Sequence, residues 1–543
     1  MPMPTFKIDG KEVPYEDGDT ILMAAYRAGI DIPYYCWHPG LSVAANCRMC
    51  LVEILPPPGR PAMMLDVLEL DKDKGEYVVV RKPKLQPACQ VPVTPNLEVL
   101  SETSPHVARA RHAVQEFLLL NHPVDCPICD QAGECKLQDY WLEHMRTSKR
   151  MHEEIIHKPK GVSFGPTIVY DAERCIVCTR CVRFCSEVVK DPVLSKRERG
   201  NLGEIIVAPG RQLDHAYTLM TEHVCPVGAL TSKDFRFKAR VWFLRSAPTI
   251  CQGCATGCNA WLDFDPRYQK VYRHRPRDNK NVNQYWMCDE GMLSYAAVSE
   301  NRVASARVDG KKTTVERGVS MTAASIKDVP KGKVAVLLSA QHSNEDNFAL
   351  VTAAKQLGFD NLYVTGKAPG KGDDVLRHPD KNPNTAGVTL VAGSSPKPFG
   401  DLLCDIDSGS ITHVLALGSA VPVEEAAAVQ ALKRLSFLAV VGVWDGPLAK
   451  AATVLIPACS WAEGEGTFVN AKGMAQRSAK AIQPVDDARP AWETILRIVE
   501  ATGETMPFKK LKDIQSAMPA PAEKAPEKKA EEPSQAGEAS ASN

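Results

Sequence analysis

The chain has 543 residues, of which 44% are hydrophobic and 24% charged, and its formal net charge is zero. This length is too great for one hydrophobic core and indicates about three or four domains. The balanced charge gives no indication of nucleic acid or an anionic membrane surface as a partner.

Potential metal ligands are concentrated in the first 290 residues. Fifteen of the 18 cysteines, with one histidine, fall there into four groups of four. The N-terminus shows no secretory signal, so closely spaced cysteines in this large chain favour metal over disulfides. The longest apolar runs, such as 435–444, are about half a membrane span. We therefore expect a soluble or peripheral protein of the cytoplasm.

The N-terminal region indicates a β-grasp domain of the ferredoxin type. Strands over 5–8 and 12–15 flank an Asp-Gly turn, and a helix over 21–28 follows N-capping residues. The ligand group of this region is Cys36, Cys47, Cys50 and Cys89. Zinc is the usual alternative for a CxxC pair, but the hairpin and helix favour [2Fe–2S]. The spacing departs from the plant type, since ten residues rather than four separate the first two cysteines.

The second group lies in a more helical region, where 106–120 carries apolar residues near helical spacing. It supplies only three thiolates, from Cys126, Cys129 and Cys135, whereas an iron–sulfur cluster usually takes four ligands. His122 is the nearest further donor. A single histidine is more often a surface or core residue, but this position favours it as a ligand. A neutral imidazole should raise the potential of the cluster, as in Rieske centres.

The third group is the most specific, because Cys175, Cys178 and Cys181 follow the bacterial ferredoxin spacing for [4Fe–4S]. Cys225, followed by proline, supplies the remote fourth ligand. Cys185 stands where a two-cluster ferredoxin places a ligand of its second cluster. No second remote triplet exists in the sequence, so we interpret Cys185 as a spare thiol.

The fourth group is Cys251, Cys254, Cys258 and Cys288, again four thiolates, with zinc as a weaker alternative. Two further cysteines, Cys404 and Cys459, are isolated. We expect them to be buried small apolar residues.

From about residue 303 the sequence predicts a doubly wound α/β domain. Short aliphatic runs alternate there with helical stretches such as 344–357 and 424–435. The expected strands are 334–340, 361–366, 388–393, 412–420, 437–444 and 452–458. The end of the chain, from about 518, has no aromatic residue and should be disordered.

The residues around the ligands resemble a known family. The motifs are Tyr34-Tyr35-Cys36-Trp37-His38-Pro39-Gly40-Leu41, Asp125-Cys126-Pro127-Ile128-Cys129-Asp130-Gln131-Ala132-Gly133-Glu134-Cys135 and Cys225-Pro226-Val227-Gly228-Ala229-Leu230. They are similar to the large iron–sulfur subunit of respiratory complex I, the G subunit of the bacterial NADH:quinone oxidoreductase. The resemblance implies one [2Fe–2S] and three [4Fe–4S] clusters, with His122 a ligand of the second, and a fourth cluster off the main path.

The α/β region resembles a molybdopterin-oxidoreductase domain that is shortened and lacks its cofactor, so no molybdopterin is expected. Glu290 stands where molybdenum relatives have a lysine between cluster and pterin, while Met292 and Cys185 depart from the family pattern. The fold class we expect is multidomain α+β and α/β. Its parts are a [2Fe–2S] ferredoxin-type domain (1–100), a His(Cys)3 [4Fe–4S] domain (101–150), a [4Fe–4S] ferredoxin-like domain (151–243), a [4Fe–4S] molybdenum-enzyme-type domain (244–300), the α/β domain (301–517) and a disordered tail (518–543).

The resemblance implies an electron-transfer subunit of a type I NADH dehydrogenase. Single electrons would pass from a flavin in a partner subunit along the clusters toward a quinone-site partner. Such a subunit lies on the cytoplasmic face of the inner membrane and meets the membrane only through its partners. The alternative function is a subunit of an NAD-linked formate dehydrogenase or hydrogenase, and a zinc scaffold is a third. Glu290 and the short α/β domain argue against formate dehydrogenase.

Overall fold

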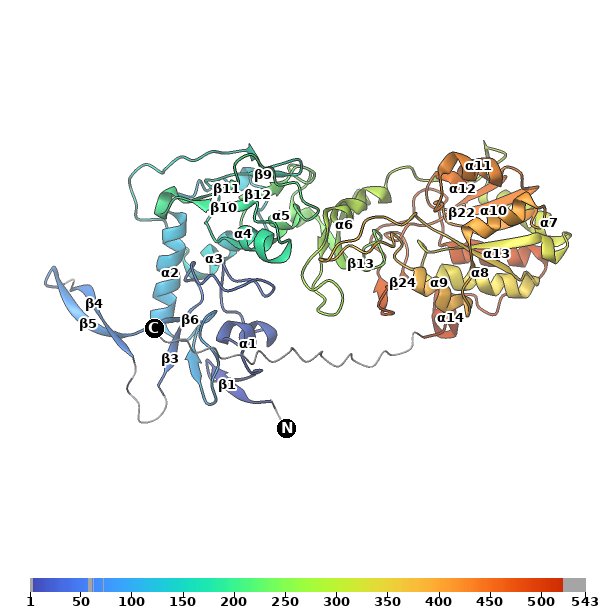
Figure 1. Cartoon of the computed structure of the whole chain (residues 1–543). Helices are drawn as coiled ribbons and strands as arrows, with labels where there is room; N and C mark the ends of the chain where they lie inside the picture. The colour runs from blue at the N-terminus through green and yellow to red at the C-terminus, as the bar shows by residue number, and fades with distance from the viewer. Residues whose placement is uncertain (1–2, 57–60, 62, 72, 521–543) are drawn as a thin grey trace, which may run out of the picture.

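The computed structural model describes residues 3–56, 61, 63–71 and 73–520. Figure 1 shows the ferredoxin-type region and the α/β domain as two bodies, with the strands that follow residue 244 between them. The predicted combination of α+β and α/β parts is confirmed.

The first domain is built on a mixed sheet of strand order β2-β1-β7-β3-β6. Its elements are β1 (Thr5–Ile8), β2 (Lys11–Pro14), α1 (Ile21–Arg27), β3 (Leu51–Leu55), β6 (Gln86–Pro87) and β7 (Glu98–Leu100). The predicted hairpin and helix are confirmed, and the Thr20 hydroxyl caps α1 by accepting the Met23 amide. Two further strands, β4 (Met64–Asp71) and β5 (Glu76–Pro83), pair as an antiparallel ribbon that extends away from the domain (Figure 1).

The second and third ligand groups lie among short elements. The helical part contains α2 (Pro105–Leu119), η1 (Cys126–Ile128) and α3 (Lys136–His144). The ferredoxin-like part contains β8 (Val162–Ser163), β9 (Ile168–Tyr170), α4 (Arg180–Arg183), the π-helical turn η2 (Phe184–Val188), β10 (Leu194–Arg197), η3 (Gly200–Leu202), β11 (Glu204–Val207), α5 (Met220–Val224), β12 (Leu230–Ser232) and η4 (Val241–Phe243). The remote Cys225 directly follows α5, which brings it back to the ferredoxin run.

The fourth group is framed by a three-stranded antiparallel sheet. Its elements are β13 (Arg245–Ile250), β14 (Asn259–Asp265), β15 (Lys270–Pro276), α6 (Asp289–Leu293) and η5 (Ser294–Val298). Three of the cysteines lie in the turn from β13 to β14, and Cys288 is the N-cap of α6.

The α/β domain has an eight-stranded sheet of order β17-β16-β23-β22-β21-β18-β19-β20, in which β23 to β20 are parallel. The strands are β16 (Arg307–Val308), β17 (Lys311–Lys312), β18 (Val334–Ser339), β19 (Asn361–Thr365), β20 (Lys397–Pro398), β21 (His413–Leu417), β22 (Phe437–Gly442) and β23 (Val454–Pro457), with the separate hairpin β24 (Gly466–Val469) and β25 (Ala475–Ser478). The helices are α7 (Val315–Lys327), η6 (Lys331–Lys333), α8 (Asn344–Leu357), α9 (Thr385–Ala392), α10 (Phe399–Asp407), α11 (Glu425–Leu432), α12 (Pro447–Ala451), α13 (Ala491–Thr502) and α14 (Leu511–Ala517).

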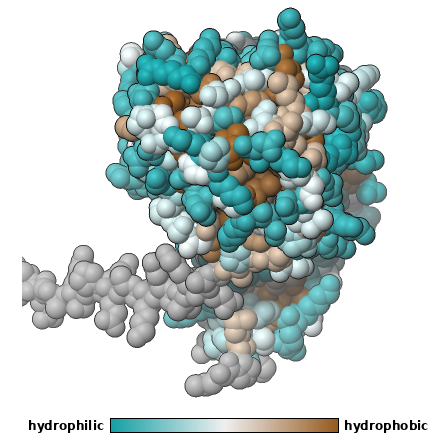
Figure 2. Space-filling view, turned by 90° about the vertical axis from the view of Figure 1, so that its right-hand side faces the viewer, coloured by the Kyte–Doolittle hydropathy of each residue, from teal (hydrophilic) through white to brown (hydrophobic). Residues whose placement is uncertain are grey.

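Helices cover both faces of this sheet, which explains its continuous aliphatic strands. Along β18, Val334 and Val336 belong to the core shared with α7, α8 and α13, whereas Ala335 and Leu337 belong to the core shared with α10, α11 and α12. The predicted doubly wound arrangement is thus confirmed. The outer face of the domain is mostly hydrophilic, with hydrophobic residues scattered between (Figure 2).

Two expectations are wrong. The predicted strand 388–393 is the end of α9, whose core-facing residues Val388 and Val391 recur at helical spacing before the left-handed Gly393. Cys404 is exposed rather than buried, because α10 turns Phe399, Leu402 and Ile406 toward the core. The expected disorder of the tail lies outside the described residues from 521 onward. Among the described helices, none is both long and apolar enough to cross a membrane.

A buried ion pair joins the start of the α/β domain to the loop after β23. The Arg302 guanidinium donates to both carboxylate oxygens of Glu463, at 3.0 and 2.7 Å, and both side chains are buried. Removing one partner from such a pair leaves an uncompensated charge in the core.

We expect Arg302→Met to destabilise the α/β domain by about 3–5 kcal/mol, because Glu463 would remain buried and unpaired. Calorimetry of the whole chain measures the shift of the α/β-domain transition. The double variant Arg302→Met/Glu463→Leu should recover most of the loss. An unchanged transition in the single variant would contradict this account of the pair.

Candidate iron–sulfur sites

Left-handed backbone conformations occur in each ligand loop. Non-glycine residues adopt positive φ in the first three loops, including Val124 (50°) and Val177 (52°), where a β-branched side chain makes that conformation costly. In the fourth loop Gly257 has φ 62°. Amide hydrogens of two loops also point at sulfur, since Val177 N donates to Cys175 Sγ and Gly253 N to Cys251 Sγ, both at 3.4 Å. Such loops suit a group that carries negative charge on sulfur.

The structure brings the first four cysteines together. A hydrogen bond joins the thiols of Cys36 and Cys47 and lowers the pKa of Cys36, and a second joins Cys50 and Cys89. Three of the four are buried and Cys47 is nearly so. Thiols at such contact distances suit a small cluster.

The second group gathers around α3. His122, Cys126 and Cys135 line one cavity of about 840 Å³, and Cys129 interacts electrostatically with Cys126. Burial lowers the pKa of His122 to about 4, so its imidazole is neutral at physiological pH. Its Nδ1 accepts the Val124 amide at 3.2 Å. A neutral imidazole is the form that ligates metal.

In the third group Cys178 and Cys181 are buried, whereas Cys175 and Cys225 are half-buried. Burial raises the pKa of Cys175 and of Cys178 to about 11 and that of Cys225 to about 12, and electrostatic interaction with other thiols of the set adds to each. These thiols are therefore protonated at neutral pH in the chain alone. Iron binding would displace those protons, which links loading to proton release.

All four cysteines of the fourth group are buried, and burial raises the pKa of Cys288 to about 11. A Cβ on Gly291 would lie 3.0 Å from Cys251 Sγ, so the glycine allows α6 to approach the sulfur. Glu290, the residue in the place of the lysine of molybdenum relatives, pairs with Lys381 of the α/β domain at 2.8 Å.

The ligand groups pack against one another, although two cysteines of the first group, Cys50 and Cys89, lie in the separate core of the first domain. A second core contains ligands of the other three groups or has ligands, including one from the first group, packed against it. They are Cys47, Cys135, Cys175, Cys181, Cys225, Cys251, Cys258 and Cys288. No three His, Cys, Asp or Glu side chains within the described ranges are arranged to hold a single metal ion.

Neighbouring groups also share contacts that the sequence did not indicate. A Cβ on Gly228, beside the third group, would lie 2.3 Å from the Cys129 sulfur of the second. Tyr35, next to Cys36, packs edge to face on Tyr140 of α3, with ring centroids 5.2 Å apart, and its hydroxyl donates to Gln115 of α2 at 2.5 Å. The tyrosine pair in the first motif was the only sequence signal for this contact.

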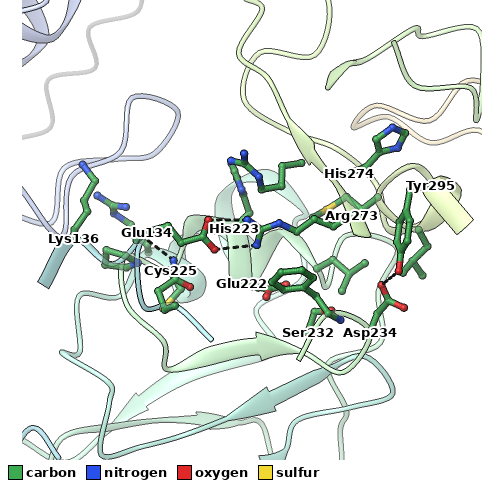
Figure 3. Close-up of a pocket in the computed structure, with 18 residues that line it drawn as sticks. Glu134, Lys136, Glu222, His223, Cys225, Ser232, Asp234, Arg273, His274 and Tyr295 are labelled. Carbon is green, nitrogen blue, oxygen red and sulfur yellow. Dashed lines mark hydrogen bonds and ion pairs between the residues drawn. The ribbon is translucent and has the colours of Figure 1, made fainter. Parts of the chain in front are cut away.

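A polar cavity of about 220 Å³ lies beside the Cys225 backbone (Figure 3). Arg273 of β15 crosses it and donates to Glu134 at 2.9 and 2.7 Å, while Tyr295 donates to Asp234 at 2.6 Å. The cavity therefore separates the second and third groups from the sheet of the fourth. Elsewhere, the buried Cys185 thiol lies 3.5 Å from His215 Nε2, outside the ligand sets.

Family comparisons match successive parts of the chain. Residues 2–104 match the 2Fe-2S iron-sulfur cluster binding domain, and 111–150 the NADH-ubiquinone oxidoreductase-G iron-sulfur binding region. Residues 165–231 match the NADH-quinone oxidoreductase subunit 3, ferredoxin-like domain. The Molybdopterin oxidoreductase Fe4S4 domain matches 244–300, and Molybdopterin oxidoreductase 313–501. Fold and sites thus define an iron–sulfur protein of ferredoxin-type domains followed by a molybdopterin-oxidoreductase-type domain.

Comparison with curated relatives identifies the family within this class of iron–sulfur proteins. The NADH-quinone oxidoreductase G subunit of Rickettsia conorii is 32% identical over 405 residues, 73% of this chain and 56% of that protein. The NADH-ubiquinone oxidoreductase 75 kDa subunit of Reclinomonas americana is 33% identical over 400 residues, 71% of this chain and 53% of that protein. The resemblance to the family of NADH-quinone oxidoreductase G subunits is confirmed. The chain spans about half the length of the curated relatives it matches.

A solved structure also matches, the crystal structure of NAD+-reducing [NiFe]-hydrogenase in the H2-reduced state. The identity is 28% and the TM-score 0.36, with 44% of this chain and 91% of that chain covered.

We expect Gly228→Ala to remove the second ligand group's metal, because the added Cβ would lie 2.3 Å from Cys129 Sγ. Iron analysis should show a loss of about four irons per chain. The matched control is Gly332→Ala, where nothing lies within 4 Å of the added Cβ. Full iron content in Gly228→Ala would show that this sulfur does not face a cluster.

Proposed function

We propose that the chain is an electron-transfer subunit of a type I NADH:quinone oxidoreductase. The observation that carries the proposal is the close packing of four donor sets, of which the second, third and fourth contribute to one hydrophobic core that Cys47 of the first adjoins. The family comparisons support it, since the matched relatives are subunits of such an enzyme. Iron–sulfur clusters, when bound, accept and donate one electron at a time.

The ligand assignment we propose is one [2Fe–2S] cluster and three [4Fe–4S] clusters. Cys36, Cys47, Cys50 and Cys89 hold the first; His122, Cys126, Cys129 and Cys135 the second; Cys175, Cys178, Cys181 and Cys225 the third; and Cys251, Cys254, Cys258 and Cys288 the fourth. The donor chemistry fits, because thiolate sulfur and neutral imidazole are the usual ligands of such clusters. The surrounding residues exclude water and donate backbone hydrogen bonds to sulfur.

The six-part division at residues 100, 150, 243, 300 and 517 remains our proposal for the domain organisation. The partners we propose are the NADH- and flavin-binding subunit and the quinone-site subunit. The chain would lie peripherally, on the cytoplasmic face of the inner membrane, and contact the membrane through those partners. We propose no molybdopterin, because Glu290 stands where molybdenum relatives have a lysine between cluster and pterin. Here Glu290 pairs with Lys381 at the edge of the fourth ligand group.

The second candidate is a subunit of an NAD-linked hydrogenase. It remains the alternative because the ligand motifs of the front half also resemble those of such enzymes. The α/β domain and the relatives matched over about two thirds or more of the chain favour the first candidate.

The proposed function is tested by measuring iron, acid-labile sulfide and molybdenum on the anaerobically purified chain. One [2Fe–2S] and three [4Fe–4S] clusters give about 14 irons per chain. This content without molybdenum is the expected result. Stoichiometric molybdenum would overturn the assignment in favour of a formate-dehydrogenase-like enzyme, and zinc in place of iron would overturn it in favour of a scaffold.

A second test concerns His122. We expect His122→Cys to retain a cluster whose reduction potential is lower, because a thiolate adds negative charge where imidazole is neutral. A redox titration followed by electron paramagnetic resonance measures the shift. An unchanged titration and spectrum in His122→Ala would exclude the histidine as a ligand, and His112→Ala, a half-buried residue of α2 outside the ligand groups, is the matched control.

A further inference from the structure

Two arginines of one helical turn reach from the third ligand group to the first. Arg180 and Arg183 form the two ends of α4, three residues apart and therefore on one side of the turn. Cys181 lies between them. The turn begins after Thr179, whose left-handed backbone (φ 63°) redirects the chain out of the ligand loop.

Each guanidinium donates to both ligand loops. Arg183 Nη2 donates to the carbonyl of Cys36 at 2.6 Å and to that of Cys178 at 3.3 Å, so it contacts a ligand residue of each group. Arg180 donates to the carbonyl of Trp37 at 2.5 Å and to that of Val224 at 3.2 Å, and these residues adjoin Cys36 and Cys225. The two side chains therefore lie between the first and third groups.

No carboxylate of the described residues pairs with these positive charges. Arg180 is 5% exposed and Arg183 is half-buried, yet within the part of the chain that the structure describes neither forms an ion pair at 4.0 Å or less. Their Nε atoms are buried and have no hydrogen-bond partner among the residues described. A buried, unpaired guanidinium is costly, so such a group normally lies beside a negative charge.

The ligand groups supply that charge once they are loaded. Four thiolates make each loaded site an anion, and each site gains one further negative charge when it accepts an electron. A cation stabilises the more negative, reduced form of a nearby redox group.

We propose that Arg180 and Arg183 form a shared cationic bridge that raises the reduction potentials of the first and third clusters together. They are positioning residues, since they contact ligand loops rather than the redox groups. The bridge would also limit the repulsion that an electron on one cluster exerts on reduction of the other. This inference rests on the proposed function, because it requires clusters in both ligand groups.

The experiment is a redox titration of the whole chain with its clusters, followed by electron paramagnetic resonance. In Arg183→Gln we expect the potentials of the [2Fe–2S] cluster and of the third cluster to fall. A tenfold loss in the equilibrium constant for reduction corresponds to about 59 mV for a one-electron couple. The potential of the fourth cluster should stay unchanged and serves as the internal reference. Arg197→Gln, an exposed arginine paired with Glu204, is the matched control.

Further variants separate charge from structure. Arg180→Gln should show the same paired shift, so either glutamine variant is sufficient if the other does not assemble. Arg183→Lys keeps the charge and should keep potentials closer to those of the unchanged chain than Arg183→Gln does. If the reduction potentials fall equally in Arg183→Lys and Arg183→Gln, the arginine has a structural role and the proposal is overturned. The same conclusion follows if neither the lysine nor the glutamine variants assemble with their clusters.

Unchanged potentials in Arg183→Gln with full iron content would overturn the bridge while leaving the proposed function intact. Absence of iron from the unmodified chain would instead overturn the proposed function.

Discussion

The burial of sulfur donors inside a hydrophobic core is the constraint on which the front half of the molecule depends. Small elements surround the ligands, and cysteines supply part of the core that larger aliphatic residues would otherwise form. Burial raises the pKa of thiols such as Cys175 and Cys135 to about 11, so the chain alone holds them as neutral groups. Iron binding replaces their protons, and the binding free energy becomes part of the stability of the fold. With the proposed clusters, folding and cluster loading would therefore be linked.

The same constraint explains why the ligand groups are in contact. Each short ligand segment lacks enough apolar residues to bury its sulfurs alone, so residues of the next segment cover them. Gly228 of the third group packs on Cys129 of the second, and Tyr35 of the first loop packs on α3. Trp286, two residues before Cys288, stacks on His38 with ring centroids 5.1 Å apart, which joins the fourth group to the first. Segments that are separate in sequence are thus one packed unit in space.

The sequence predicted an element correctly where the residues that determine it are close together along the chain. Thr20 and the residues after it encode their own helix, and α8 has the predicted bounds, because capping residues and periodicity act within a few positions. The prediction of a strand over 388–393 was wrong because a short run with β-branched residues can form either a strand or a helix. Packing against the sheet selected the helix. The contacts of Arg180 and Arg183 with the first ligand loop could not be predicted from the sequence, because the carbonyl groups that accept their hydrogen bonds are about 140 residues away along the chain.

The ligand sets themselves remain predictions from spacing, and the convergence of their side chains supports them. The sequence could not show what covers the fourth set, because that contact depends on the α/β sheet. In open α/β sheets, ligands bind at the carboxyl ends of the strands. The segment after β19 leaves that edge and closes over the fourth ligand loop: Ala255 N donates to the carbonyl of Asp380 at 2.9 Å, and the Thr256 hydroxyl to that of Leu376 at 2.6 Å.

This arrangement gives the α/β domain a role that needs no cofactor of its own. On the other side of the same loop, Gln476 of β25 donates to the carbonyl of Gly257 at 2.8 Å. Two segments of the α/β domain therefore hold the turn that carries Cys251, Cys254 and Cys258. Because this turn also belongs to the core of the front half, a change in the sheet would alter ligand burial. A domain of the molybdopterin-oxidoreductase type is thus constrained by the iron–sulfur sites it covers, whether or not it binds a pterin.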